Sequence, residues 1–183
     1  MEFIQQLDLS ILLFIQEHLR CAWMNGFWDF ITHFGDGGVF WILLTIALLI
    51  PKKTRKVGIV AGCSLILNFL ITNVTLKPLV DRVRPYHYSD AIIPLGRIPS
   101  EASFPSGHTS ASFSCALIYV RMLPKKYGIP LVVLATLIAL SRLYLCVHFP
   151  TDVLGGFLVA MVSSTVVYTC YQYLERRKTQ KET

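Results

Sequence analysis

The segment FPSGHTSASF, residues 104–113, places Ser106, Gly107 and His108 where an apolar helix is expected to begin. The first backbone N–H groups of a helix have no partner within the helix, and the dipole is positive at that end. The segment therefore predicts an anion site, where Gly107 lets an anion approach the backbone and His108 exchanges a proton with it. In the alternative reading, Ser106 only caps the helix and a neighbouring side chain satisfies His108.

Two cations lie in the long polar segment before this helix. Lys77 in KPLVDRVRP precedes Arg84 by seven residues, and Arg84 is followed by Pro85. A residue before proline is biased toward extended backbone, and the planar fork of arginine suits phosphate oxygens. Together these two side chains would hold a phosphate. Alternatively, they extend to lipid headgroups.

The segment SRLYLCVHFPTD combines a cation, an imidazole and a carboxylate. Arg142 lies six residues before His148, Asp152 lies four residues after it, and Pro150 interrupts the chain between them. We expect His148 to end one helix and Asp152 to lie in the first turn of the next. An aspartate beside a histidine fixes its tautomer and leaves the other nitrogen free for chemistry. The alternative is a structural ion pair.

Apolar helices must position these side chains. Hydrophobic residues make up 54% of the 183 residues and charged residues 15%, against roughly 25% charged in soluble domains. The apolar runs are 39–50, 57–76, 108–123, 129–147 and 153–174, and several approach the roughly 20 residues that cross a bilayer. We predict an all-α integral membrane protein: a six-helix transmembrane bundle, with five clear spans plus an amphipathic N-terminal helix.

Two of these elements each have two possible placements. Run 39–50 is short unless the FGDGG before it lies near the interface, and the amphipathic segment 3–19 either spans or lies in the interface. We expect one membrane-embedded domain over residues 1–183. The sequence does not predict an oligomeric state.

The basic residues predict the orientation of the bundle. Segments 51–56, 121–126 and 176–181 carry eleven of the seventeen Lys and Arg residues, all on one side of this threading. The positive-inside rule makes that side, with the C-terminus, cytoplasmic in a multi-pass protein of the cell membrane. The three motif segments then meet on the extracytoplasmic face. Because the basic residues flank the spans, the net charge of +6 does not indicate a nucleic-acid partner.

Other side chains have weaker signals. Two histidines and an aspartate are a known zinc set, but the three cations on the same face would repel a dication, so we expect no metal and no cofactor. The five cysteines lack paired ligand spacing and are expected to be small buried hydrophobic residues. Arg82 and Arg97 are candidates for a headgroup or a second phosphate, whereas Tyr86 and His87 are expected to pack the loop.

Taken in order, KPLVDRVRP, PSGH and SRLYLCVHFPTD resemble the three-part motif of the type 2 phosphatidic acid phosphatase family over residues 77–152. In its small size and short loops, the sequence is most similar to the bacterial members that act on undecaprenyl diphosphate. The resemblance implies a metal-independent reaction through a phosphohistidine. It also implies the residue roles: His148 as nucleophile, Asp152 as its orienting partner, His108 as general acid, and Lys77, Arg84, Ser106, the Gly107 amide and Arg142 as phosphate ligands.

We therefore expect an integral membrane phosphatase whose partners are the membrane and a lipid phosphate, most simply undecaprenyl diphosphate cleaved to undecaprenyl phosphate. Phosphatidate or phosphatidylglycerophosphate is the alternative substrate. A phosphatase for soluble phosphate esters is a second possibility, which the lack of an added loop for a polar leaving group disfavours. A third is a non-catalytic lipid-phosphate binder or transporter, which would not need both histidines and the aspartate.

Overall fold

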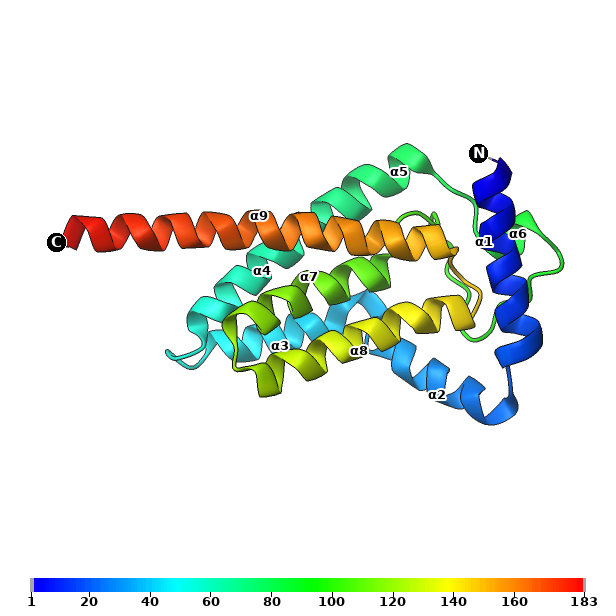
Figure 1. The fold of residues 1–183 in the computed structure, drawn as a ribbon, viewed down its shortest axis with the longest axis horizontal. Helices are drawn as coiled ribbons and strands as arrows, with labels where there is room; N and C mark the ends of the chain where they lie inside the picture. The colour runs from blue at the N-terminus through cyan, green and yellow to red at the C-terminus, as the bar shows by residue number, and fades with distance from the viewer. Residues whose placement is uncertain (1, 183) are drawn as a thin grey trace.

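The computed structural model describes residues 2–182, and the regular elements in that range are helical (Figure 1). In chain order they are α1 (Glu2–Phe14), the π-helical turn η1 (Ile15–Leu19), α2 (Ala22–His33), the 3-10 turn η2 (Asp36–Gly38), α3 (Val39–Leu49), α4 (Arg55–Phe69), the π-helical turn η3 (Leu70–Leu76), α5 (Lys77–Val80), α6 (Pro85–Tyr88), α7 (Gly107–Met122), α8 (Lys125–Tyr144) and α9 (Pro150–Glu182).

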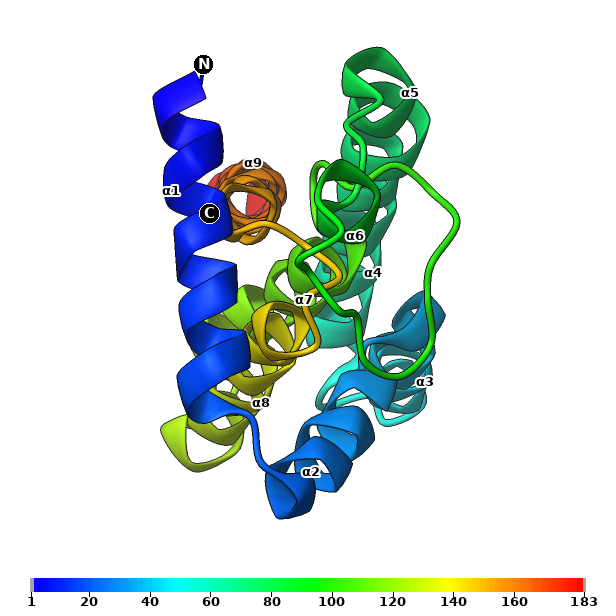
Figure 2. The ribbon, with the colours of Figure 1, turned by 90° about the vertical axis from the view of Figure 1, so that its right-hand side faces the viewer.

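Helix α7 forms the centre of the bundle. It packs against α4, α8 and α9 (Figure 2), and its Ile118 and Tyr119 are fully buried in the main core together with Trp41. The hydroxyl groups of Tyr119 and Thr45 lie 2.7 Å apart, so this polar pair is satisfied within the bundle. The side chains of α7 are therefore held from several sides, which fixes the position of its N-terminal end.

Within residues 2–182, four helical stretches are long and apolar enough to cross a membrane: Ala22–Leu49, Arg55–Tyr88, Lys125–Tyr144 and Pro150–Gln180. The expected all-α membrane protein is confirmed. Run 39–50 is not a short span by itself, because α2 precedes α3 and the two form a stretch of 28 residues. Between them, Gly37 and Gly38 have φ values of +56° and +68°, a backbone that glycine adopts without strain.

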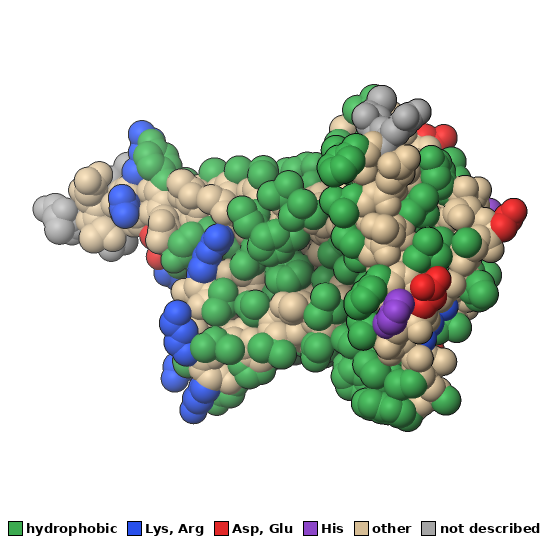
Figure 3. Space-filling view, turned by 45° about the vertical axis from the view of Figure 1, so that its right-hand side comes forward, with side chains coloured by type: hydrophobic (Ala, Val, Ile, Leu, Met, Phe, Trp, Pro, Cys, Tyr) green, Lys and Arg blue, Asp and Glu red, His purple; other side chains and the backbone are tan. Residues whose placement is uncertain are grey.

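Hydrophobic side chains cover much of the bundle surface between its two ends, and Lys and Arg side chains gather at one end (Figure 3). That end holds the loop 50–54, the loop between α7 and α8, and the part of α9 that projects beyond the other helices (Figure 1). Two cysteines, Cys63 and Cys170, lie exposed on this surface, so the expectation that the cysteines are buried holds for Cys115 and Cys146 only.

Helix α1 runs across the opposite end of the bundle, roughly perpendicular to α9 (Figures 1 and 2). Its Asp8 and Leu12 are buried against the bundle, whereas Phe3, Leu7 and Phe14 are exposed. The sequence left open whether residues 3–19 span the membrane or lie in the interface. In the structure, α1 lies across the end of the bundle rather than parallel to the other helices.

The segment before α7 is more ordered than a loop of about 29 residues suggests. Helix α4 continues through η3 and α5 to Val80, so Lys77 lies on a helix, and α6 follows directly after Arg84. The Tyr86 hydroxyl donates to the carbonyl of Pro99 at 2.6 Å, which is the loop-packing role expected of it. His87 is exposed.

Candidate active site

The start of α7 is fixed by side-chain and backbone contacts. Ser106 is its N-cap, and its hydroxyl oxygen accepts a hydrogen bond from the Thr109 amide at 3.4 Å. A Cβ on Gly156 of α9 would come within 2.6 Å of the Ser106 carbonyl, so only glycine allows α9 this close to the start of α7. The Ser106 side chain therefore caps the helix, whereas Gly107 and His108 line a cavity.

His148 lies between α8 and α9, with a side chain that is only 2% exposed. Its Nδ1 is 3.5 Å from Asp152 Oδ2, and its Nε2 is 3.3 Å from Arg84 Nη1. Because arginine is always a donor, Nε2 accepts and carries the lone pair, and the ring proton is then on Nδ1, facing the carboxylate. Burial lowers the pKa of His148 to about 3, so the imidazole is neutral near neutral pH.

Asp152 is fully buried in the first turn of α9. Besides His148, its carboxylate accepts hydrogen bonds from the Phe149 amide at 2.9 Å and from the Ser103 hydroxyl. Arg82 Nη1 donates to its other oxygen at 2.7 Å. These donors stabilise the ionised carboxylate in an otherwise dry environment.

Arg84 is held by main-chain oxygens. Its Nε donates to the Glu101 carbonyl at 2.7 Å, and its Nη1 donates to the Val147 carbonyl at 2.7 Å. The side chain is 4% exposed and lines the cavity beside His148. The guanidinium is thus fixed in orientation, and no carboxylate in the described part of the chain forms an ion pair with it, which suits an anion ligand.

Arg142 is the second buried guanidinium. It is 3% exposed, and its Nη1 donates to the Thr32 hydroxyl of α2 at 2.5 Å. Its Nε is buried without a hydrogen-bond partner among the described residues. Buried polar atoms are usually satisfied, so this donor is consistent with a ligand that the cavity receives.

Lys77 approaches the start of α7 from α5. A Cβ built on Gly107 would lie 3.8 Å from Lys77 Nζ, which places the ammonium beside the first turn of α7. In this structure, Lys77 forms an ion pair with Glu101 of the loop. The Glu101 side chain is 66% exposed and that of Lys77 only 12%, and the hydrogen bond from Lys77 lowers the pKa of Glu101.

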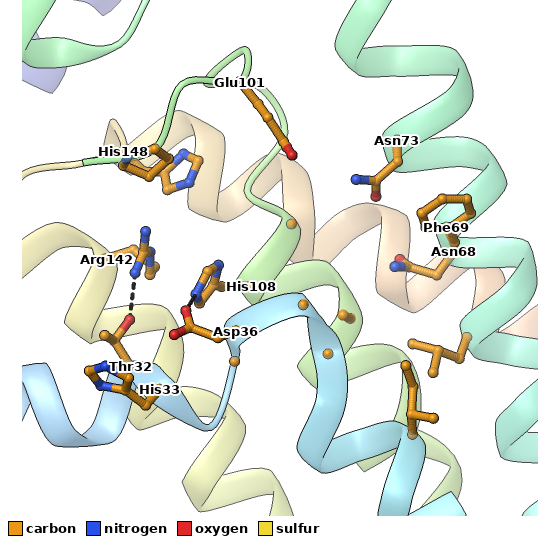
Figure 4. Close-up of a pocket in the computed structure, with 18 of the residues that line it drawn as sticks. Thr32, His33, Asp36, Asn68, Phe69, Asn73, Glu101, His108, Arg142 and His148 are labelled. Carbon is orange, nitrogen blue, oxygen red and sulfur yellow. Dashed lines mark hydrogen bonds and ion pairs between the residues drawn. The ribbon is translucent and has the colours of Figure 1, made fainter. Parts of the chain in front are cut away.

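His108 points into the same cavity, and its Nε2 lies 2.8 Å from Asp36 Oδ1 (Figure 4). Asp36 comes from the turn between α2 and α3. The preceding Gly35 lies against the histidine ring: a Cβ there would be 2.5 Å from His108 Cδ2 and 2.8 Å from Ile138 Cγ2. Asp36 is the neighbour that satisfies this histidine.

The cavity that these residues line has a volume of about 910 Å³. Its polar end contains His148, His108 and the three motif cations Lys77, Arg84 and Arg142, and Arg97 also lines the cavity. The cavity continues between α3 and α4 as an apolar groove. The groove is lined by Ile42, Ile46 and Leu49 from α3 and by Leu65, Ile66 and Phe69 from α4. It extends to Leu49, at the end of α3 away from His108.

Residues 57–176 match the model of the PAP2 superfamily, which is well over half of the chain. The chain belongs to the PAP2 superfamily. It is 31% identical over 156 residues to an undecaprenyl-diphosphatase from Sulfolobus acidocaldarius, covering 85% of this chain and 75% of the relative. It is 36% identical over 140 residues to a decaprenylphosphoryl-5-phosphoribose phosphatase from Mycobacterium tuberculosis, covering 75% of each chain.

The fold is also that of a solved PAP2 enzyme. The crystal structure of a transmembrane PAP2-type phosphatidylglycerolphosphate phosphatase from Bacillus subtilis matches with a TM-score of 0.76 and 30% identity. The match covers 94% of this chain and 88% of that one. This chain is therefore a membrane-embedded phosphatase of the PAP2 lipid phosphatase class.

The structure brings together most of the PAP2 motif residues that the sequence singled out. One expectation needs correction. Arg82 is not available for a headgroup, because its Nη2 donates to Asp8 Oδ2 at 2.8 Å and its Nη1 donates to Asp152. Arg97, the other candidate, lines the cavity. The Ser106 hydroxyl oxygen accepts the cap hydrogen bond, and its role as a phosphate ligand stays a prediction.

Four residues that the sequence reasoning did not place in the site lie next to the motif residues. They are Asp8, Thr32, Asp36 and Ser103, which contact Arg82, Arg142, His108 and Asp152 respectively. Only Asp36 had a local signal, since an acid between glycines in FGDGG indicates a tight turn with an exposed carboxylate.

Proposed function

We propose that this PAP2 protein removes the terminal phosphate of a lipid phosphate or diphosphate through a phosphohistidine, with undecaprenyl diphosphate as the favoured substrate. The observation that carries the proposal is the continuity of the cavity, in which an anion site of two histidines and three cations opens into an apolar groove. A phosphate on a long apolar chain has this division of chemistry. A soluble phosphate ester would leave the groove without a ligand.

In the first step, His148 Nε2 attacks phosphorus with its lone pair. The P–O bond to the lipid breaks as the N–P bond forms, and His108 supplies the proton to the departing oxygen. Asp152 stabilises the proton on Nδ1 as His148 becomes positively charged. In the second step, water gives a proton to His108 and attacks the phosphohistidine, which releases inorganic phosphate and restores both histidines.

The three cations account for the charge in this scheme. Phosphoryl transfer depends mainly on positioning and on stabilising the equatorial oxygens. Arg84 and Arg142 are buried donors with fixed orientation, and Lys77 adds a third charge next to the Gly107 amide. Donors that are already in place need no reorganisation during the reaction.

The preference for undecaprenyl diphosphate comes from relatives, since the undecaprenyl-diphosphatase of Sulfolobus acidocaldarius covers most of this chain. Phosphatidylglycerophosphate is the second candidate, because the structural relative from Bacillus subtilis acts on it. In the cell, we place this site on the extracytoplasmic face and the C-terminus in the cytoplasm, because the basic loops lie at the opposite end of the bundle.

The test is phosphate release by purified protein in detergent with excess chelator, from undecaprenyl diphosphate, phosphatidate and phosphatidylglycerophosphate in parallel. His148→Ala should abolish release. His87→Ala, which removes an exposed histidine of α6, should leave phosphate release unchanged. Equal rates in wild type and His148→Ala would refute the phosphohistidine, and a folded wild type that binds these lipids without releasing phosphate would favour a binder or transporter.

A further inference from the structure

We propose that Asp36 is a positioning residue for the proton-donating histidine, aiming His108 at the leaving oxygen of the substrate and stabilising the protonated form of its ring. The proposal rests on the proposed function of the same site. Residues 57–176, which match the PAP2 model, do not include Asp36, and no motif of the sequence contains it. Its position next to His108 is a property of the turn between α2 and α3.

The electrostatic surroundings of His108 explain why a carboxylate is needed. The nearby charged groups are Arg142 on α8, Arg84 before α6, Glu101 of the loop and Asp36 of the turn. Both guanidinium groups oppose a positive charge on a buried imidazole, and so does the loss of water. Glu101 is already paired with Lys77. Asp36, at 2.8 Å, is the carboxylate in contact with the His108 ring.

The geometry also assigns the two ring nitrogens. Nε2–H donates to Asp36 Oδ1, while the ring edge that carries Cδ2 lies against Gly35. Nδ1 is on the opposite edge of the ring and points away from Asp36 (Figure 4). In the imidazolium, Nε2–H stays bonded to the carboxylate and the Nδ1 proton passes to the leaving oxygen as the P–O bond breaks. His108 is then neutral, and Asp36 remains ionised throughout.

The glycines on both sides of Asp36 allow its contact with His108. Gly37 and Gly38 have positive φ values that kink the chain directly after Asp36, between α2 and α3. Gly35 has an ordinary φ of −97°, so its constraint is the space against His108 rather than the backbone. Gly35→Ala should therefore displace the ring without straining the turn.

The experiment compares two substrates with the same long chain, one an alkyl phosphate and the other a nitrophenyl phosphate. A basic alkoxide needs a proton to leave, and a nitrophenolate does not. Asp36→Asn keeps a hydrogen-bond acceptor and removes the charge. It should lower kcat for the alkyl phosphate about 100-fold, the scale of lost acid catalysis, and for the nitrophenyl phosphate less than about tenfold. Asp36→Glu should restore part of the loss.

Two further variants distinguish this role from a structural one. His108→Ala should show the same dependence on leaving group, and adding Asp36→Asn to it should cause no further loss, because both changes remove one function. Asp90→Asn, at an exposed loop carboxylate, is the matched control and should resemble wild type.

The outcomes separate the two proposals. An Asp36→Asn enzyme that resembles the Asp90→Asn control, or that loses activity equally on both substrates, would overturn the role of Asp36 while leaving the phosphatase intact. A wild-type protein that releases phosphate from neither substrate, nor from the membrane lipids, would overturn the proposed function and this role with it.

Discussion

The ion pair between Lys77 and Glu101 predicts that Glu101→Gln will bind phosphate more tightly. In the structure, the Glu101 carboxylate forms an ion pair with the Lys77 ammonium, which is the group that a substrate phosphate would contact. A phosphate ion entering the site must displace it and is also repelled by its charge. Glu101 therefore acts as an internal competitor for the anion site.

The size of the effect follows from the exposure of the two side chains. Lys77 is 12% exposed and Glu101 is 66% exposed, so solvent screens the pair strongly. Exposed ion pairs contribute up to about 1 kcal/mol, and a pair with one shielded partner belongs at the upper end. Loss of about 1 kcal/mol of competition corresponds to roughly fivefold tighter binding. The competitive inhibition constant of inorganic phosphate should fall by about that factor.

The assay measures inhibition of lipid hydrolysis by inorganic phosphate at pH 7, with Glu17→Gln as a control for loss of an exposed carboxylate on the same end of the bundle. Because Lys77 lowers the pKa of Glu101, the carboxylate stays ionised from neutral pH down past its usual value of 4.5. The difference between variant and wild type should therefore persist from pH 7 down to pH 4.5 and be lost only below that value. An unchanged or weaker inhibition by phosphate in Glu101→Gln would refute the reasoning.

Three other changes test separate parts of the structure. Gly62 lines the groove, and a Cβ there would lie 3.6 Å from Thr45 Cγ2, an ordinary contact. Gly62→Leu should therefore obstruct the groove and lower kcat/KM for a long-chain lipid but not for a short-chain phosphate, whereas Gly26→Leu, in open space, should affect neither. Equal losses on both chain lengths would argue against the groove. Arg82→Gln removes the arginine that two buried carboxylates share. It should lower the free energy of unfolding by about 3 kcal/mol, measured by denaturation in detergent, and should also lower kcat. Wild-type values of both would remove Arg82 from the support of the site. The pKa of His148 is about 3 in the folded protein and 6.5 in the unfolded chain, so its contribution to stability is present above pH 6.5 and is lost as the pH falls toward 3. Between pH 7 and 4.5, the melting temperature of His148→Gln should therefore decline less than that of the wild type. Parallel declines would contradict the buried neutral imidazole.

The sequence predicted the helices and the convergence of the motifs because both depend on local information. Apolar runs of membrane length determine spans, and the threading of those spans brings residues 77, 108 and 148 to one end. The placement of α1 across the end of the bundle could not be predicted from local information. An amphipathic helix buries its polar side chains wherever a partner exists, and the partner of Asp8 is Arg82, 74 residues away.

The same reason explains the misplacement of Arg82. Its position among other basic residues in the long segment suggested an anion ligand, but a guanidinium next to two buried carboxylates is worth more to the fold as their counterion. Its stacking over Phe149, 4.1 Å from the ring centroid, further fixes it away from the cavity. Charge in a sequence indicates that a partner exists without identifying the partner.

Each histidine of the site has a carboxylate partner, and the two systems differ in origin. Asp152 lies four residues after His148, inside the part of the chain that matches the PAP2 model. Asp36 contacts His108 from residues before that part, and so does Asp8, which holds the arginine that binds Asp152. In the proposed mechanism the motif residues form the phosphate site, and α1 and the α2–α3 turn supply the carboxylates that orient two of them. If that mechanism holds, a chain that retained residues 57–176 and lost these two carboxylates would keep every motif residue and have a poorly oriented nucleophile and a poor proton donor.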